Sequence, residues 1–148
     1  LTNLVATVRA LGYGVHAHSP EAEALEVCRR LGAETSPLTS VRDPLTFDDD
    51  EATAIVLAFH DHEWEPMLLK AALQTPAFWI GAVGSAVTHA ERLMKLRAAG
   101  EDENGVARVR GTIGLIGRAR DPRILAASIL ADVLATRQTD AAPLLYRG

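Results

Sequence analysis

The sequence has almost no cysteine and no long apolar run. Its single cysteine, Cys28, excludes an intrachain disulfide framework and any zinc site built from several thiolates. Cys28 falls on the apolar stripe of a helical pattern, which predicts a core side chain rather than a reactive thiol. No apolar run approaches the ~20 residues that a membrane span needs, and the first residues lack a signal-peptide pattern. We therefore expect a soluble, cytoplasmic protein with no membrane partner.

Basic residues are also in short supply. The chain has 15 Lys and Arg residues against 19 Asp and Glu residues, a formal net charge of −4. Nucleic-acid binding needs clustered positive charge to contact phosphates, so we expect no nucleic-acid partner. What the chain does have is apolar content, at 48% of its 148 residues. This size and composition fit a single domain over residues 1–148.

Short apolar runs alternate with helical patterns along the chain. Residues 54–59 and 78–83 are too short for buried helices and have the composition of buried parallel strands. Between them, Glu65-Pro66 marks a helix start, because proline has a helical φ and needs no N–H at the first helical position. We also expect strands at 14–18 and 35–39, an extended segment at 106–110, and helices at 2–11, 21–31, after Ser85 and after Pro122. This alternation predicts an α/β fold, a Rossmann-like doubly wound parallel sheet in three α/β/α layers.

One part of that fold is not found in the sequence. A Rossmann fold normally begins with a strand and a Gly-x-Gly-x-x-Gly turn, whereas this chain opens with the helix of residues 2–11. Gly12 and Gly14 stand between a helix and a strand, which is the wrong context for that turn. The first strand normally lies in the middle of the sheet. We therefore expect that residues before Leu1 or another chain complete the sheet, and that the protein is a homo-oligomer.

Gly81, Gly84 and Ser85 form the first candidate site. A strand that ends in glycines and leads into a serine-capped helix lets backbone N–H groups approach an anion, and the helix dipole adds its attraction. Close packing of a helix against the strand would explain the same glycines equally well.

His60, Asp61 and His62 follow the first of the two apolar runs and form a second candidate site. An imidazole beside a carboxylate can transfer protons near neutral pH or bind zinc. The alternative is that these residues bond the backbone of their own loop and cap the next helix. Sequence neighbours rarely converge on one ion, so we assign no metal ligand. We expect His60 and Asp61 to face Gly81 to Ser85, because both loops leave the carboxyl ends of parallel strands.

Two further groups are weaker candidates. Gly114, Gly117, Arg118 and Arg120 form a basic glycine loop that would either cover a phosphate or pterin or remain a solvated surface loop. His16 and His18 lie two apart on a strand and share a face, but no third metal ligand is evident.

Three segments occur in a distinctive order within residues 53–138. They are His60-Asp61 after T-A-I-V-L-A-F, the turn W-I-G-A-V-G-S, and I-G-L-I-G-R-A-R-D-P followed by I-L-A-A-S-I-L-A-D-V-L-A. This combination resembles the carboxyl-terminal Rossmann domain of the XdhC/CoxF family, accessory proteins of molybdenum hydroxylases such as xanthine dehydrogenase. The resemblance implies a molybdenum hydroxylase as client, and a role in holding the molybdenum cofactor (molybdopterin) or assisting its sulfuration and insertion. It implies no catalytic residue.

The chain departs from the family pattern at several positions, as a divergent or N-terminally truncated member would. Ala86 to Thr88 replace the arginine-rich segment that usually follows Gly-Ser, which leaves His89 as the nearest candidate for an anion contact. His18-Ser19 stands where relatives carry an acidic residue suited to a ribose hydroxyl. Arg118 stands near an expected glycine.

The sequence leaves three functions open. The first is an accessory factor that binds the molybdenum cofactor or a nucleotide. The second is an NAD(P)-dependent oxidoreductase. The third is a degenerate Rossmann domain kept for protein–protein contact. The sequence identifies no catalytic residue that would decide whether the protein is an enzyme.

Overall fold

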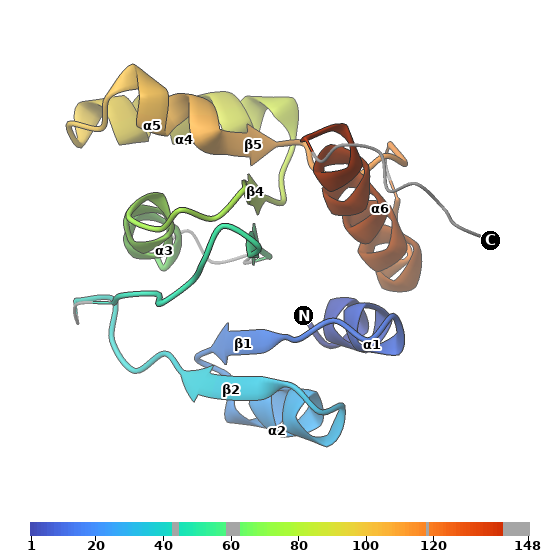
Figure 1. Ribbon diagram of the computed structural model, residues 1–148. Coiled ribbons are helices and arrows are strands. Elements are labelled where there is room, and N and C mark those ends of the chain that lie inside the picture. Colours follow the sequence, from blue (N-terminus) through green and yellow to red (C-terminus); the bar gives the residue numbers. More distant parts are fainter. Residues whose placement is uncertain (43–44, 59–62, 118, 141–148) are drawn as a thin grey trace. The chain divides into compact units, whose positions relative to one another are not determined.

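The computed structural model describes residues 1–42, 45–58, 63–117 and 119–140, without the side chains of 138–140 (Figure 1). Contacts between residues divide the chain into two compact units. Unit 1 consists of Leu1–Asp43 and Gly114–Asp132, and unit 2 of Pro44–Ile113 and Val133–Gly148.

Unit 1 contains a two-stranded parallel sheet. Its elements are α1 (Thr2–Ala10), β1 (His16–Ser19), α2 (Ala22–Arg30), β2 (Glu34–Pro37) and the first part of α6 (Pro122–Asp140). His16 of β1 lies opposite Glu34 of β2, and Ser19 lies opposite Pro37. The helix α2 connects the two strands, as parallel pairing requires. The helices and strands expected in this part of the sequence are confirmed.

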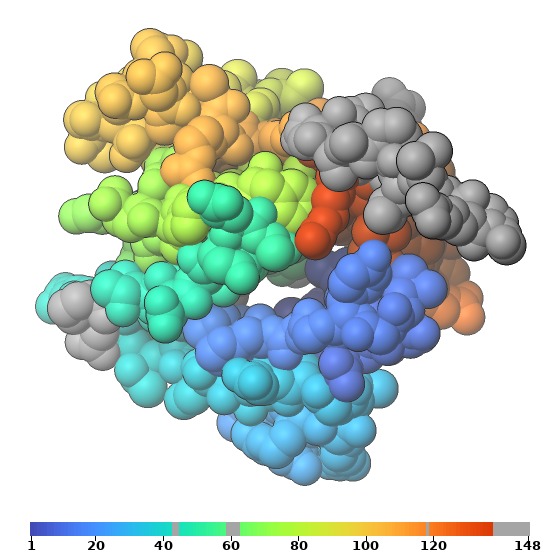
Figure 2. Space-filling view, viewed as in Figure 1, coloured from blue at the N-terminus to red at the C-terminus, as the bar shows by residue number. Residues whose placement is uncertain are grey.

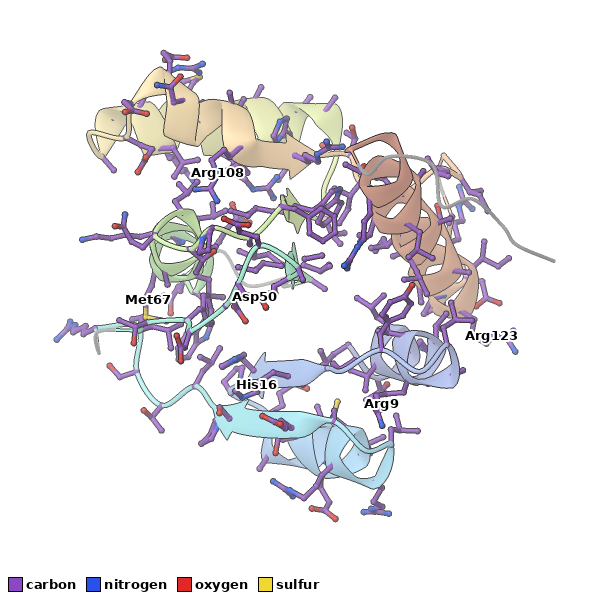
Figure 3. The ribbon with its side chains drawn as sticks, viewed as in Figure 1. Arg9, His16, Asp50, Met67, Arg108 and Arg123 are labelled. Atoms are coloured by element: carbon purple, nitrogen blue, oxygen red, sulfur yellow. The ribbon has the colours of Figure 1, made fainter. Side chains whose placement is uncertain are left out.

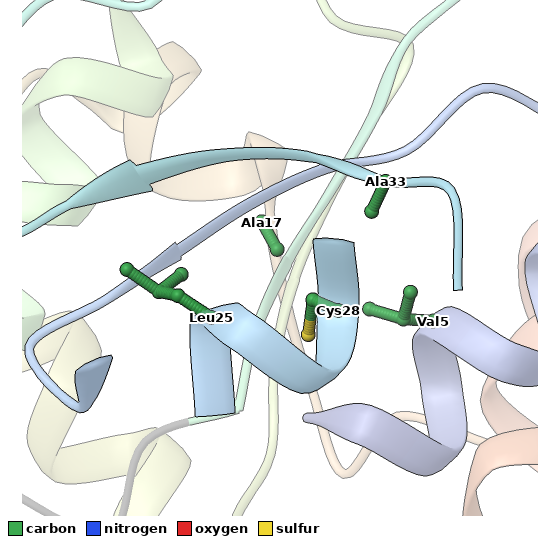
Figure 4. Close-up of a cluster of buried hydrophobic side chains, with 5 residues drawn as sticks. All are labelled: Val5, Ala17, Leu25, Cys28 and Ala33. Carbon is green, nitrogen blue, oxygen red and sulfur yellow. The ribbon is translucent and has the colours of Figure 1, made fainter. Parts of the chain in front are cut away.

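The core of unit 1 is a cluster of small and medium apolar side chains. It comprises Val5, Ala17, Leu25, Cys28 and Ala33 (Figure 4). Cys28 has no exposed surface, which confirms it as a core residue, and burial raises the pKa of its thiol.

The sequence predicts a buried stripe of Ala24, Val27, Cys28 and Leu31 on α2, and this stripe is only partly buried in the structure. Val27 and Leu31 are each 37% exposed, whereas Leu25 and Cys28 are buried. Residues of α2, drawn in light blue, lie at the surface in the space-filling view (Figure 2), and on this helix Arg29 pairs with Glu26. The apolar stripe on α2 is broad, and packing against β1, β2 and α1 decides which part of it is covered.

Unit 2 contains a three-stranded parallel sheet in the order β3-β4-β5. Its elements are β3 (Ala54–Leu57), α3 (Glu65–Leu73), β4 (Trp79–Ala82), α4 (Ala86–Ala98), α5 (Glu103–Arg108) and β5 (Val109–Gly111), together with the end of α6. All four residues of the central strand β4 are buried, as its apolar sequence predicted. The helix α3 begins at Glu65 with Pro66 in its first turn, which confirms the expected start.

The extended segment expected at residues 106–110 is wrong in its first half, because α5 continues to Arg108. The Asp102 carboxylate caps this helix by accepting a backbone N–H at 2.8 Å. Arg108 then donates to the carbonyl oxygens of Leu73 and Thr75, at 2.9 and 2.6 Å, which ties α5 to the end of α3 (Figure 3). A long-range contact therefore stabilises a helix of only six residues.

The order of strands in each sheet agrees with the doubly wound fold. Its usual order is 3-2-1-4-5-6, and β2-β1 and β3-β4-β5 match the third and second strands and the fourth to sixth. Among the residues that the structure describes, no strand pairs with the second edge of β1 or of β3.

Helix α6 is 19 residues long. Within the described ranges, neither α6 nor any other helix combines the length and apolarity needed to cross a membrane.

Candidate functional site

The turn after β4 has the geometry of a helix start at the carboxyl end of a strand. The N–H of Val83 donates to Leu57 of β3 at 2.9 Å, which extends the sheet pairing by one residue. Gly84 then has a φ of 153°, a conformation that residues with a side chain rarely adopt. A Cβ added at Gly84 would lie 3.2 Å from two side-chain carbons of Thr88. Glycine is therefore required here both for its conformation and for space.

Ser85 caps α4, as its position in the sequence predicted. Its Oγ accepts the backbone N–H of Thr88 at 3.1 Å, and the two hydroxyl groups lie 2.9 Å apart. The cap satisfies one of the N–H groups that a helix leaves free in its first turn.

Gly81 lies inside β4, not in the turn that follows it. A Cβ added there would lie 2.1 Å from the Trp79 ring, because the indole covers this face of the strand. Packing against Trp79 is thus sufficient reason for glycine at position 81. The indole Nε1 of Trp79 is buried without a hydrogen-bond partner among the described residues.

Arg92 is a residue of this region that the sequence reasoning missed. Its side chain is 2% exposed, and its Nε and Nη2 donate to the two carboxylate oxygens of Glu65 at 2.7 and 3.0 Å. Nη2 also donates to the carbonyl oxygen of Val83 at 3.0 Å. Its burial could have been predicted from its spacing, because Arg92 lies four residues before the buried Leu96 and therefore on the same side of α4.

His89 lies between Arg92 and β5. Its Nδ1 is 3.5 Å from Nη1 of Arg92, and a Cβ added at Gly111 would lie 2.0 Å from its ring. Burial lowers the pKa of His89, Arg92 lowers it further, and Glu65 acts in the opposite direction. The imidazole is therefore neutral at pH 7 and lies over the carboxyl end of β5.

The glycine loop after β5 is attached to α6 within unit 1. The N–H of Gly114 donates to the Asp132 carboxylate at 2.8 Å, and the N–H of Ile116 donates to Ser128 at 2.7 Å. These two N–H groups are therefore engaged by α6. Arg118, which was expected to contribute positive charge to this loop, lies outside the described residues.

His60 and Asp61 also lie outside the described residues, as does His62. Their expected position opposite the turn after β4 therefore remains a prediction. The nearest described residues on the chain are Glu63 and the N-cap of α3, Trp64.

His16 and His18 lie at the start and near the end of β1. Their ring centroids are 4.2 Å apart, and Nε2 of His16 bonds to the Ser36 hydroxyl at 2.8 Å. Burial, and then the neighbouring His16, lowers the pKa of His18 to about 4. Within the described parts of the chain, no group of three His, Cys, Asp or Glu residues is placed to hold a metal ion.

Parallel strands joined by helices, with a serine-capped helix after the turn at the end of β4, define a Rossmann-type α/β protein. Comparison with protein families matches residues 1–133 to the XdhC Rossmann domain. The chain belongs to this family, which confirms the resemblance seen in its sequence.

A curated relative is the molybdenum cofactor insertion chaperone PaoD of Escherichia coli (strain K12). It is 39% identical to this chain over 88 residues. That alignment covers 60% of this chain and 28% of PaoD, so the chain spans less than a third of the relative's length.

Proposed function

We propose that this protein is an accessory factor that binds the molybdenum cofactor and assists its sulfuration or its insertion into a molybdenum hydroxylase. The observation that carries the proposal is the 39% identity to a molybdenum cofactor insertion chaperone, within a family match over residues 1–133. A cytoplasmic location is part of the proposal, supported by a single, fully buried cysteine.

The turn after β4 is the place that we propose for a phosphate group such as the one that molybdopterin carries. Gly84 has no side chain, and Ser85 starts a helix of 13 residues whose N-terminal dipole attracts negative charge. We propose that a cofactor phosphate binds at Gly84 and Ser85, on the turn that Gly81 and Trp79 support, with His60 and Asp61 of the preceding loop facing it. The loop after β5 is not part of this proposed site, because the N–H of Gly114 already donates to Asp132. When bound, the cofactor would supply the molybdenum centre that the client enzyme uses.

An NAD(P)-dependent oxidoreductase is the second candidate for the same fold. A ribose hydroxyl is usually bound by an acidic side chain at the end of the second strand of the fold, and β1 ends in His18 and Ser19. This difference favours the cofactor-binding factor over the oxidoreductase.

Native mass spectrometry of the protein, purified from a host that makes molybdenum cofactor, tests the proposal. We expect a retained mass that matches a pterin phosphate, together with no hydride transfer from NADH or NADPH. Retention of a nicotinamide nucleotide with hydride transfer would support the oxidoreductase instead. No retained ligand and no uptake of added pterin or nucleotide would leave only a role in protein–protein contact.

We also propose that the protein is a homo-oligomer. The strand edges of β1 and β3 that remain open among the described residues support this, as do two exposed apolar side chains of α4. These side chains are Val87 and Met94, at 69% and 66% exposure. Sedimentation velocity is expected to show a species larger than the 15.9 kDa monomer, and a monodisperse monomer would contradict the proposal.

A further inference from the structure

The guanidinium of Arg92 connects three segments of unit 2. It lies on α4, it pairs with Glu65 at the start of α3, and it donates to the Val83 carbonyl at the end of β4. A charged pair this deeply buried is costly unless its hydrogen bonds are nearly all satisfied. Nε and Nη2 meet this requirement with three bonds between 2.7 and 3.0 Å. The pair therefore fixes the start of α3 relative to the turn that precedes α4.

The remaining nitrogen of the same guanidinium, Nη1, faces Nδ1 of His89 at 3.5 Å. Arginine can only donate hydrogen bonds, so a bond between these two atoms requires Nδ1 to be the ring nitrogen without a proton. A neutral imidazole then carries its proton on Nε2. The distance is long for a hydrogen bond, but the positive charge of Arg92 favours the same arrangement electrostatically.

The Cγ and Nδ1 atoms of the His89 ring also lie against β5. A Cβ added at Gly111 would come within 2.1 Å of both Cγ and Nδ1, so the ring occupies the space where a side chain would be. Glycine at position 111 thus permits the ring to lie where Arg92 can orient it.

We propose that Arg92 is a positioning residue for His89. Anchored by Glu65, it holds the neutral imidazole of His89 with its proton on Nε2. His89 then presents an N–H donor beside the turn after β4. The ligand group that suits this donor is an oxyanion such as a phosphate. That last step rests on the proposed function, whereas the orientation of His89 does not.

The tautomer of His89 is measured directly by long-range 1H–15N correlation spectroscopy on the full chain labelled with 15N-histidine. The His89 signals are assigned from their loss in a His89→Gln variant. We expect the pattern of a ring protonated on Nε2 at pH 7. A ring protonated on Nδ1, or an even mixture of the two forms, would overturn the proposal.

Variants then separate positioning from general stability. Arg92→Lys keeps the charge but cannot donate to Glu65, Val83 and His89 in one plane, so we expect the preference for the Nε2 proton to weaken. Gly111→Ala places a Cβ where the His89 ring lies and touches neither Glu65 nor Arg92 directly, so we expect the same weakening once folding of the variant is verified by circular dichroism. An unchanged tautomer in both folded variants would contradict a positioning role. If Arg92→Lys does not fold, Gly111→Ala alone decides.

The ligand step is tested with pyrophosphate as the probe, titrated by isothermal calorimetry into the native protein and two His89 variants, and in the native protein the His89 Nε2–H signal is followed as well. Glutamine places its N–H group near the position of Nε2, and asparagine places it near Nδ1. His89→Gln is therefore expected to bind within about threefold of the native protein, and His89→Asn about tenfold more weakly. Equal affinities in the two variants would remove His89 from the site. If the native protein shows no response to pyrophosphate, the phosphate site of the proposed function fails, while the tautomer result still decides the role of Arg92.

Discussion

Gly84 is the residue on which the turn after β4 depends most directly. Its φ of 153° disfavours any side chain, and an added Cβ would lie 3.2 Å from Thr88 and 3.4 Å from Nη2 of Arg92, which is tight packing. The conformation of the turn after β4, where we propose that a phosphate binds, therefore depends on Gly84 and on the two side chains packed against it.

We expect Gly84→Ala to lower the free energy of unfolding by about 1–3 kcal/mol, because alanine is strained at this φ and meets Thr88. Urea denaturation provides the measurement. Gly14→Ala is the matched control, since a Cβ at Gly14 meets no atom within 4 Å, and it should change stability by no more than about 0.5 kcal/mol. Equal effects of the two substitutions would show that Gly84 is not constrained.

His18 makes the stability of the protein depend on pH. Its pKa falls from the usual 6.5 to about 4 in the folded protein, so below pH 6.5 the unfolded chain binds this proton more readily than the folded chain. The free energy of unfolding should therefore decrease as the pH falls from 6.5 to about 4, and the contribution should be fully present above 6.5. Urea denaturation across this range is the measurement, and His18→Gln should flatten the decrease. An NMR titration that placed the ring pKa near 6.5 would contradict the prediction.

At the scale of elements, Ser85 caps the first turn of α4, directly after the turn that follows β4. Ser85→Ala removes the acceptor for the Thr88 N–H and should cost about 0.5–2 kcal/mol. Ser85→Asp keeps an acceptor at this position, so its stability should stay close to that of the native protein. Its carboxylate should nevertheless repel a phosphate and weaken pyrophosphate binding. If Ser85→Asp destabilised α4 as much as Ser85→Ala, the cap would not be the source of the stability.

At the scale of the whole molecule, each compact unit has its own natural probe. Cys28 lies in unit 1 with no exposed surface, and both tryptophans, Trp64 and Trp79, lie in unit 2. Thiol labelling therefore reports the opening of unit 1, and tryptophan fluorescence reports the opening of unit 2.

If residues 1–148 form one domain, the two probes should show the same urea midpoint. We expect this result because α6 contributes residues to both units, so neither unit can lose this helix alone. Labelling of Cys28 at a lower urea concentration than the fluorescence change would show that unit 1 unfolds separately. Its five-residue cluster of mostly small side chains would then be the physical reason.

Local signals in the sequence determined most of the elements. Pro66 marked the start of α3, Ser85 the start of α4, and the apolar runs marked β3 and β4. The family was also recognisable, because its segments lie in order along the chain. These features depend on neighbours in the sequence, and the chemistry of a cap or a proline acts within a few residues.

Only the tertiary structure decided how distant residues combine. Glu65 and Arg92 are 27 residues apart, and no local pattern indicates that the two form a buried pair. Gly81 looked like part of an anion-binding turn, yet the position of the Trp79 ring gives it a packing role. The turn after β4 lies where the glycines and Ser85 predicted it, but packing between α3, α4 and β5 brings Arg92 and His89 beside it. Burial and long-range contacts depend on the whole fold, and that is why the sequence by itself could not reveal them.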